Sequence, residues 1–222
     1  MTGGLSSRPE RAIVVLAGLS WAWMVVEAMT ARQLTCCAAH PSALRELGAW
    51  IAMIVAMMIP PLHEHIADVS ARSYRARRLR AVTLFVLGYL AWWSALGVAF
   101  VAIRRFDLAH DPRVAPALCV FAAGWTLLPS REKWRRLCHR RIVLRPVGWQ
   151  ADCDALRQGL TAGGPCAMMC WPLMVACALT GHNLVVMVAC TALTFVEKRM
   201  FSLRQKPLAL GALLVGATTL AF

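Results

Sequence analysis

The sequence predicts an all-α fold: a bundle of helices that crosses a membrane about seven times. Of its 222 residues, 59% are apolar, and the mean hydropathy is +0.57. A soluble domain has roughly 45–50% apolar residues. The excess lies in blocks about as long as a bilayer is thick, separated by short charged stretches. One large soluble core is excluded, because such blocks leave too little polar surface to cover them.

Seven apolar segments form these blocks, and together they make residues 1–222 a single transmembrane domain. Several are shorter than the ~20 residues of an ideal span, which flanking Arg and Trp side chains and local thinning of the bilayer can accommodate. The predicted spans are residues 12–29, 48–62, 82–103, 114–129, 156–179, 184–196 and 207–222.

The positive charge predicts how the bundle is oriented. Of the formal net charge of +13, most lies before the first span and after the second, fourth and sixth. Seven spans place all four regions on one side, and the positive-inside rule makes that side cytoplasmic, with the N-terminus. We therefore expect a multi-pass protein of the inner (plasma) membrane of a cell. Because the charge lies between apolar blocks, lipid is the expected partner and nucleic acid is not.

Sulfur is the chemical group that stands out. The chain has nine Cys and eleven Met but no phosphate-binding loop, His-Glu-x-x-His motif or serine elbow. In the fifth span Cys166, Cys170 and Met174 follow one another at i, i+4 and i+8, so they form one stripe of a helix, flanked by Met169. An enzyme is the weakest interpretation, because no general base and nucleophile occur at a spacing that indicates a catalytic pair.

Two methionines of the second span, Met53 and Met57, share one helix face with Trp50. Thiolate and thioether ligands suit Cu(I), whereas Zn(II) usually takes four Cys or His ligands. We therefore expect the sulfur faces of the second and fifth spans to meet inside the bundle and to bind copper. The alternative is packing, because Met fills gaps and a free Cys behaves as a small apolar residue.

Other Cys and His residues lie between the spans. Cys36, Cys37 and His40 follow the first span and form either an outer metal acceptor or an ordinary loop. A disulfide between the adjacent cysteines is possible in an oxidising compartment but strained. On the cytoplasmic side, the residues predicted to be solvated in loops are His63, His65, Cys138, His139 and Cys153. The alternative is metal binding by the His-x-His pair, for which two ligands are a weak signal. Glu27 and Glu197, costly in lipid, are candidates for a functional role.

The second, fifth and sixth spans resemble an uncharacterised bacterial family of predicted metal-binding integral membrane proteins with a domain of unknown function. The segments that carry the resemblance are Trp50-x-x-Met53, Ala56-Met57-Met58-x-Pro60, Arg157-Gln158-Gly159-Leu160, Cys166 to Trp171, Leu173-Met174, Asn183-Leu184 with Met187, and Glu197-Lys198. Where that family has two adjacent Cys, this chain has Met169-Cys170. The exchange keeps sulfur but loses a charge, which favours Cu(I) over Zn(II).

Together these features predict a membrane protein that binds or handles a soft metal, copper(I) above all, for transport, delivery or insertion. The predicted ligands are Cys166, Met169, Cys170, Met53, Met57, Cys36, Cys37 and His40. The partner would be a subunit of a membrane complex or a metal chaperone. The alternative is a non-catalytic accessory subunit of a larger assembly, such as a copper-dependent oxidase or monooxygenase.

Overall fold

The computed structural model describes residues 8–33, 42–104, 114–128, 130–145 and 147–199, and all regular structure in these ranges is helical. This confirms the all-α prediction for the described part of the chain. One short 3₁₀ turn, η1 (Pro60–Leu62), joins two of the helices. The α-helices are α1 (Arg8–Gln33), α2 (Ala43–Met58), α3 (His63–Arg72), α4 (Arg78–Arg104), α5 (Val114–Leu127), α6 (Ser130–Cys138), α7 (Trp149–Leu179) and α8 (Leu184–Arg199).

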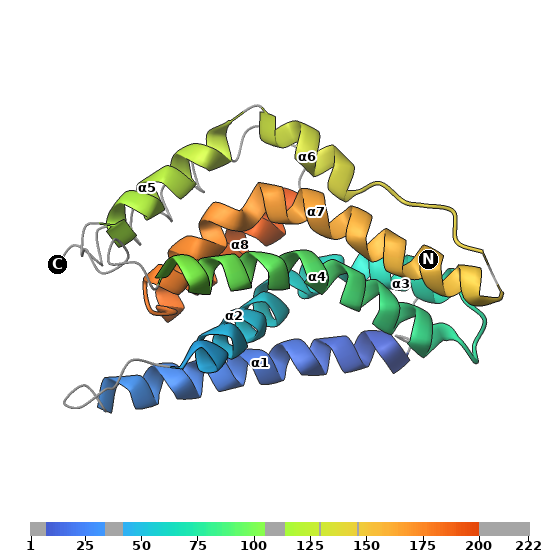
Figure 1. The fold of residues 1–222 in the computed structure, drawn as a ribbon, viewed down its shortest axis with the longest axis horizontal. Helices are drawn as coiled ribbons and strands as arrows, with labels where there is room; N and C mark the ends of the chain where they lie inside the picture. Colours follow the sequence, from blue (N-terminus) through green and yellow to red (C-terminus); the bar gives the residue numbers. More distant parts are fainter. Residues whose placement is uncertain (1–7, 34–41, 105–113, 129, 146, 200–222) are drawn as a thin grey trace.

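The helices pack around a central pair, α4 and α7, which run parallel to each other (Figure 1). On one side of this pair lie α1 and α2, and on the other lie α5 and α6. The chain passes along the bundle in alternate directions: α1, α4 and α7 run one way, and α2 with α3, α5 with α6, and α8 return (Figure 1).

Within the described ranges, three helices are long and apolar enough to cross a membrane: Arg11–Thr30, Arg78–Arg104 and Trp149–Leu179. The segments Ala43–Met58 and Pro60–Arg72 make a fourth if the pair, bent by 47°, counts as one span. Two shorter apolar helices occupy the predicted fourth and sixth spans, and residues 207–222 lie outside the described ranges. The structure thus supports three or four of the seven predicted spans.

The contact between α4 and α7 depends on glycine. Gly159 and Gly163 form a Gly-x-x-x-Gly step on α7 that packs against the backbone of α4. A Cβ on Gly159 would overlap the carbonyl oxygen of Phe85, and one on Gly88 would overlap that of Leu156. Small residues at such spacing let two helix backbones approach closely in an apolar medium.

Tryptophan indoles donate hydrogen bonds to backbone carbonyls near the prolines. Pro60 has no N–H, so it leaves the carbonyl of Ala56 without its helical donor. The indole of Trp21 donates to that oxygen at 3.0 Å. On α7, which contains Pro165 and Pro172, carbonyls close to each proline accept in the same way. These are the bonds from Trp92 to Leu160 (3.1 Å) and from Trp125 to Met169 (3.2 Å).

Two regions predicted as loops, residues 63–81 and 130–155, are largely helical, which corrects the sequence interpretation. After the η1 turn the chain resumes as α3, because His65, Ile66 and Val69 form a buried face one turn long. In α6 the guanidinium of Arg131 is buried and donates to the carbonyl of Met169 at 3.1 Å. Both helices are amphipathic, with apolar residues too sparse to signal a span.

Ion pairs join the helices at both ends of the bundle. At the end where α1, α4 and α7 begin, Asp152 binds Arg77 at 2.6 Å and Arg80 at 2.8 Å. Basic residues of both predicted regions meet at this end, where Asp68 accepts from Arg141 and Arg145 pairs with Asp154, whereas Arg131 lies further along α7. At the opposite end, Glu27 binds Arg45 at 2.9 Å.

The turn between α7 and α8 is stabilised by backbone geometry. Gly181 and His182 have φ of +64° and +58°, and the N–H of His182 donates to the carbonyl of Cys177 at 3.0 Å. This bond closes α7 in the manner of a Schellman cap. Burial lowers the pKa of His182, Arg104 lowers it further, and the carboxylate of Glu27 opposes both.

Replacing Gly159 with Ala should destabilise the bundle. The added methyl overlaps the α4 backbone, which cannot move as a flexible side chain can, and overpacking of this kind costs about 1–3 kcal/mol. Gly18→Ala is the matched control, since nothing lies within 4 Å of its Cβ position and Ala favours helix. Thermal unfolding of the detergent-solubilised protein should show a lower Tm for Gly159→Ala alone; equal Tm values would refute the close packing.

Acid should destabilise the protein through His182. Because its folded pKa is lowered, the unfolded chain binds the proton more tightly, and stability falls as pH drops below the unfolded value of about 6.5. Asn tolerates positive φ, and its side chain does not gain or lose a proton near neutral pH. We expect the loss of Tm between about pH 8 and about pH 5 to be smaller in His182→Asn than in the wild type. An equal or larger loss in the variant would contradict this assignment.

Candidate functional site

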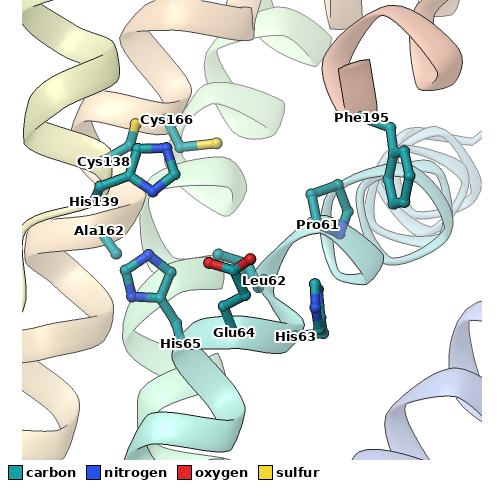
Figure 2. A pocket seen from close by; sticks show the side chains of 10 residues that line it. All are labelled: Pro61, Leu62, His63, Glu64, His65, Cys138, His139, Ala162, Cys166 and Phe195. Atoms are coloured by element: carbon teal, nitrogen blue, oxygen red, sulfur yellow. The ribbon is translucent and has the colours of Figure 1, made fainter. Parts of the chain in front are cut away.

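A small pocket lies beside the middle of α7, where four other elements begin or end. There α2 ends and η1 begins, α3 begins after η1, and α6 ends (Figures 1 and 2). Its chemistry comes from imidazole, thiol and carboxylate groups. The lining residues are Pro61, Leu62, His63, Glu64, His65, Cys138, His139, Ala162, Cys166 and Phe195.

One wall of the pocket combines side chains from α3, α7 and the end of α6. Figure 2 shows Cys138, His139 and Cys166 grouped above His65, while His63 lies on the other side near Pro61. The imidazole of His65 is buried between the rings of Phe85 and His139, with centroids at 6.1 and 6.3 Å. Imidazole and thiol groups from distant parts of the sequence therefore converge on one space.

The placement of His65 and Cys138 corrects the sequence interpretation. Both were predicted as solvated loop residues, but their exposed fractions are 7% and 6%. His139 is half-buried beside them, whereas His63 and Glu64 are exposed at the pocket. Cys153 is exposed, as predicted. The difference arises because the chain after each proline-containing segment continues as an amphipathic helix that packs on the central pair, α3 mainly on α4 and α6 on α7.

Cys166 connects the pocket to the sulfur stripe of α7. Its thiol lines the pocket and forms a hydrogen bond with the hydroxyl of Tyr89 at 3.1 Å. The rest of the predicted stripe, Met169, Cys170 and Met174, is buried. The prediction that this face lies inside the bundle is confirmed, and Cys166 is the stripe residue that reaches the pocket.

The methionines of α2 are also inside. Met53 and Met57 are fully buried and belong to the same core cluster as Cys166 and Cys170. The main neighbours of α2 are α1 and α4, whereas those of α7 are α4, α5 and α6. Thus α4 packs against both sulfur-bearing helices, and the direct packing of α2 on α7 that we expected is not a principal contact.

The size and donors of the pocket limit what it can hold. The space open to the centre of a water-sized sphere is about 20 Å³, enough for a water molecule or a metal ion but not for an organic substrate. Thiol and imidazole donors suit soft or borderline metals. In the described ranges no three His, Cys, Asp or Glu side chains are arranged to hold a metal, so coordination here requires rotamer changes.

The structure does not place the other predicted site residues in the pocket or does not describe them. Cys36, Cys37 and His40 lie outside the described residues, as does the side chain of Glu197. Glu27, a candidate from its position in an apolar helix, accepts two hydrogen bonds from Arg45 at 2.9 and 3.1 Å. This ion pair at the end of the bundle explains how the carboxylate of Glu27 can lie in an apolar helix.

The sequence identifies the His and Cys residues of the pocket as candidates, but no pattern in it predicts that they lie close together. The available signal was the Pro60-Pro61 break directly before His63-Glu64-His65, because a helix broken at mid-depth exposes polar groups only where they line a cavity. No comparable sequence pattern predicts that α6 packs on α7, since that contact depends on one buried arginine, Arg131, which donates to the carbonyl of Met169.

Comparison with known proteins identifies a family. Residues 47–221 match the sequence model of the PpoB2 family, described as a copper chaperone. No curated protein and no solved structure matches the chain. The matched region covers more than half of the chain and includes the pocket, the α2 methionines and the stripe of α7. The chain therefore belongs to the PpoB2 family of copper chaperones.

Proposed function

We propose that the protein holds Cu(I) as cargo in the pocket beside α7 and passes it to a partner protein. The observation that carries this proposal is the position of Cys166: it begins the buried sulfur stripe and lines a pocket shared with Cys138, His139 and His65. The family's description as a copper chaperone supports the choice of metal.

The donor set suits a cargo site better than a permanent one. Thiolate sulfur binds Cu(I) strongly, and neutral imidazole adds a donor that can dissociate. A thiolate entering from a partner can displace these ligands one at a time, so the ion is never released into water. His63 and Glu64, exposed at the pocket, are placed where such a partner would first make contact.

The remaining predicted ligands extend the pathway in this proposal. Met169 and Cys170 continue from Cys166 along α7, and Met53 with Met57 supply further thioethers to the same core. Cys36, Cys37 and His40 are proposed as acceptors on the outer side of the membrane. Each is a soft or borderline donor suited to copper.

We further propose seven spans with the basic end of the bundle in the cytoplasm. The alternating directions of the described helices fit repeated crossings (Figure 1), of which three or four are long and apolar enough by themselves. The orientation is supported by the meeting of basic residues at one end, where Arg77 and Arg141 bind carboxylates of neighbouring segments. In this arrangement residues 114–129 cross the bilayer as the fourth span, residues 130–155 follow on the cytoplasmic side, and residues 207–222 are the proposed seventh span.

Replacing Cys138 and Cys166 together with Ser should remove the copper ion held in the pocket. A neutral hydroxyl is similar in size to a thiol but is a poor ligand for Cu(I). We expect the double variant, purified from copper-supplied cells under reducing conditions, to carry one copper ion fewer per chain than the wild type, by elemental analysis.

Cys153→Ser is the control, because that thiol is exposed on α7 and lines no part of the pocket. It should retain the wild-type copper content. If the double variant remains folded and binds copper as the wild type does, the pocket is not the cargo site. Wild-type protein that carries no copper and co-purifies with a stable assembly would instead favour the accessory-subunit alternative.

Thiol labelling of intact cells tests the orientation. Cys36 or Cys37 should react with a membrane-impermeant maleimide, whereas Cys153, which is exposed at the basic end, should react only after the membrane is permeabilised. Mass spectrometry of the labelled peptides distinguishes the positions. Labelling of Cys153 in intact cells would reverse the proposed topology.

A further inference from the structure

We infer that Tyr89 sets how tightly the pocket holds copper, because its hydroxyl donates a hydrogen bond to the sulfur of Cys166. Tyr89 is a positioning residue that acts through Cys166 and is not itself a ligand. The inference rests on the proposed function, in which Cys166 binds Cu(I), and it gives a role to a side chain that the sequence does not mark as a candidate.

The hydroxyl of Tyr89 on α4 contacts the thiol of Cys166 on α7. The oxygen and the sulfur are 3.1 Å apart, and the exposed fractions of the two side chains are 0% and 1%. Cys166 lines the pocket, whereas Tyr89 is not among the described residues that do so (Figure 2). The phenol therefore touches the sulfur from behind, away from the space that an ion would occupy.

The close contact between α4 and α7 holds both partners in place. Both glycines of the Gly-x-x-x-Gly step pack on the backbone of Tyr89. A Cβ on Gly159 would lie 2.9 Å from its nitrogen, and one on Gly163 would lie 2.9 Å from its carbonyl oxygen. Cys166 follows Gly163 by three residues on the same helix. The packing of the two backbones therefore fixes the distance between phenol and thiol.

Helix α4 supports a second pocket residue in the same way. Phe85, four residues before Tyr89, stacks on His65 with ring centroids 6.1 Å apart. Phe85 is also fully buried, and the described residues that line the pocket do not include it. One face of α4 thus stands behind pocket residues of both α3 and α7. Groups that orient metal ligands from behind tune the affinity of a metal site.

Copper binding strengthens this hydrogen bond. When the Cu–S bond forms, the S–H bond of Cys166 breaks and its proton passes to the aqueous phase, with no change in oxidation state. The sulfur is then an anion within the buried core, where a charge without a hydrogen-bond donor is costly. With a neutral thiol either group can donate, but a thiolate only accepts, so the Tyr89 hydroxyl donates a charge-assisted bond. The bond therefore favours the copper-bound state over the empty one.

Tyr89→Phe should weaken Cu(I) binding at the pocket, because it removes the hydroxyl and keeps the ring. Loss of such a supporting group lowers metal affinity about 10- to 100-fold. We expect a change of this size when the purified full-length protein competes anaerobically with bicinchoninate for Cu(I). Tyr74→Phe is the matched control, since Tyr74 is the other tyrosine of the chain and is exposed. It should match the wild type.

Two further measurements separate this bond from simple packing. In a Cys166→Ala background, Tyr89→Phe should cause no additional loss of copper affinity. Without copper, the infrared S–H stretching band that disappears in Cys166→Ala should shift in Tyr89→Phe and stay in place in Tyr74→Phe.

An additional loss in the Cys166→Ala background, or an unshifted band in Tyr89→Phe, would overturn the inference. If the wild type holds copper in the pocket and Tyr89→Phe binds it equally well, the role of Tyr89 fails and the cargo pocket stands. If Cys138→Ser/Cys166→Ser binds copper as the wild type does, the cargo pocket fails and this inference falls with it.

Discussion

The close approach of α4 and α7 is the constraint on which the rest of the structure depends. Glycines 88, 159 and 163 bring the two backbones together because they have no Cβ atoms to separate them. Tyr89, one residue beyond Gly88, can then reach the thiol of Cys166. The other helices pack around this pair, so the position of the pocket wall follows from a contact between two backbones rather than from the ligands themselves.

Proline and tryptophan act together around that pair. A proline removes a backbone donor, and an unsatisfied carbonyl in an apolar medium is costly. Here an indole from a neighbouring helix donates to the carbonyl freed by Pro60, and two others donate near Pro165 and Pro172. Each such bond also joins two helices. The bend after Pro60 can therefore be stable, and it brings His65 to the side of α7.

Much of the fold could be predicted from apolar block length, because lipid imposes that pattern directly on the sequence. The long helices α1, α4 and α7 were found in this way, and so was the buried stripe from Cys166 to Met174. The sequence does not predict helices α3 and α6, since their buried faces are short and their stability comes from contacts with other helices. The sequence does not predict the pocket either, because the pocket too depends on contacts between distant segments. His65, Cys138 and Cys166 are far apart in sequence, and no local pattern reports that they meet.

The burial of sulfur has a consequence for chemical durability. Copper ions generate peroxide-derived oxidants, and thioethers are readily converted to sulfoxides, which are polar and disrupt a core. Met53, Met57, Met169 and Met174 are almost completely buried, whereas Met29 and Met168 have exposed fractions of 65% and 44%. Of these six side chains, Met29 and Met168 are therefore the more accessible. The same packing that buries these thioethers keeps them away from oxidants and preserves them in their reduced form.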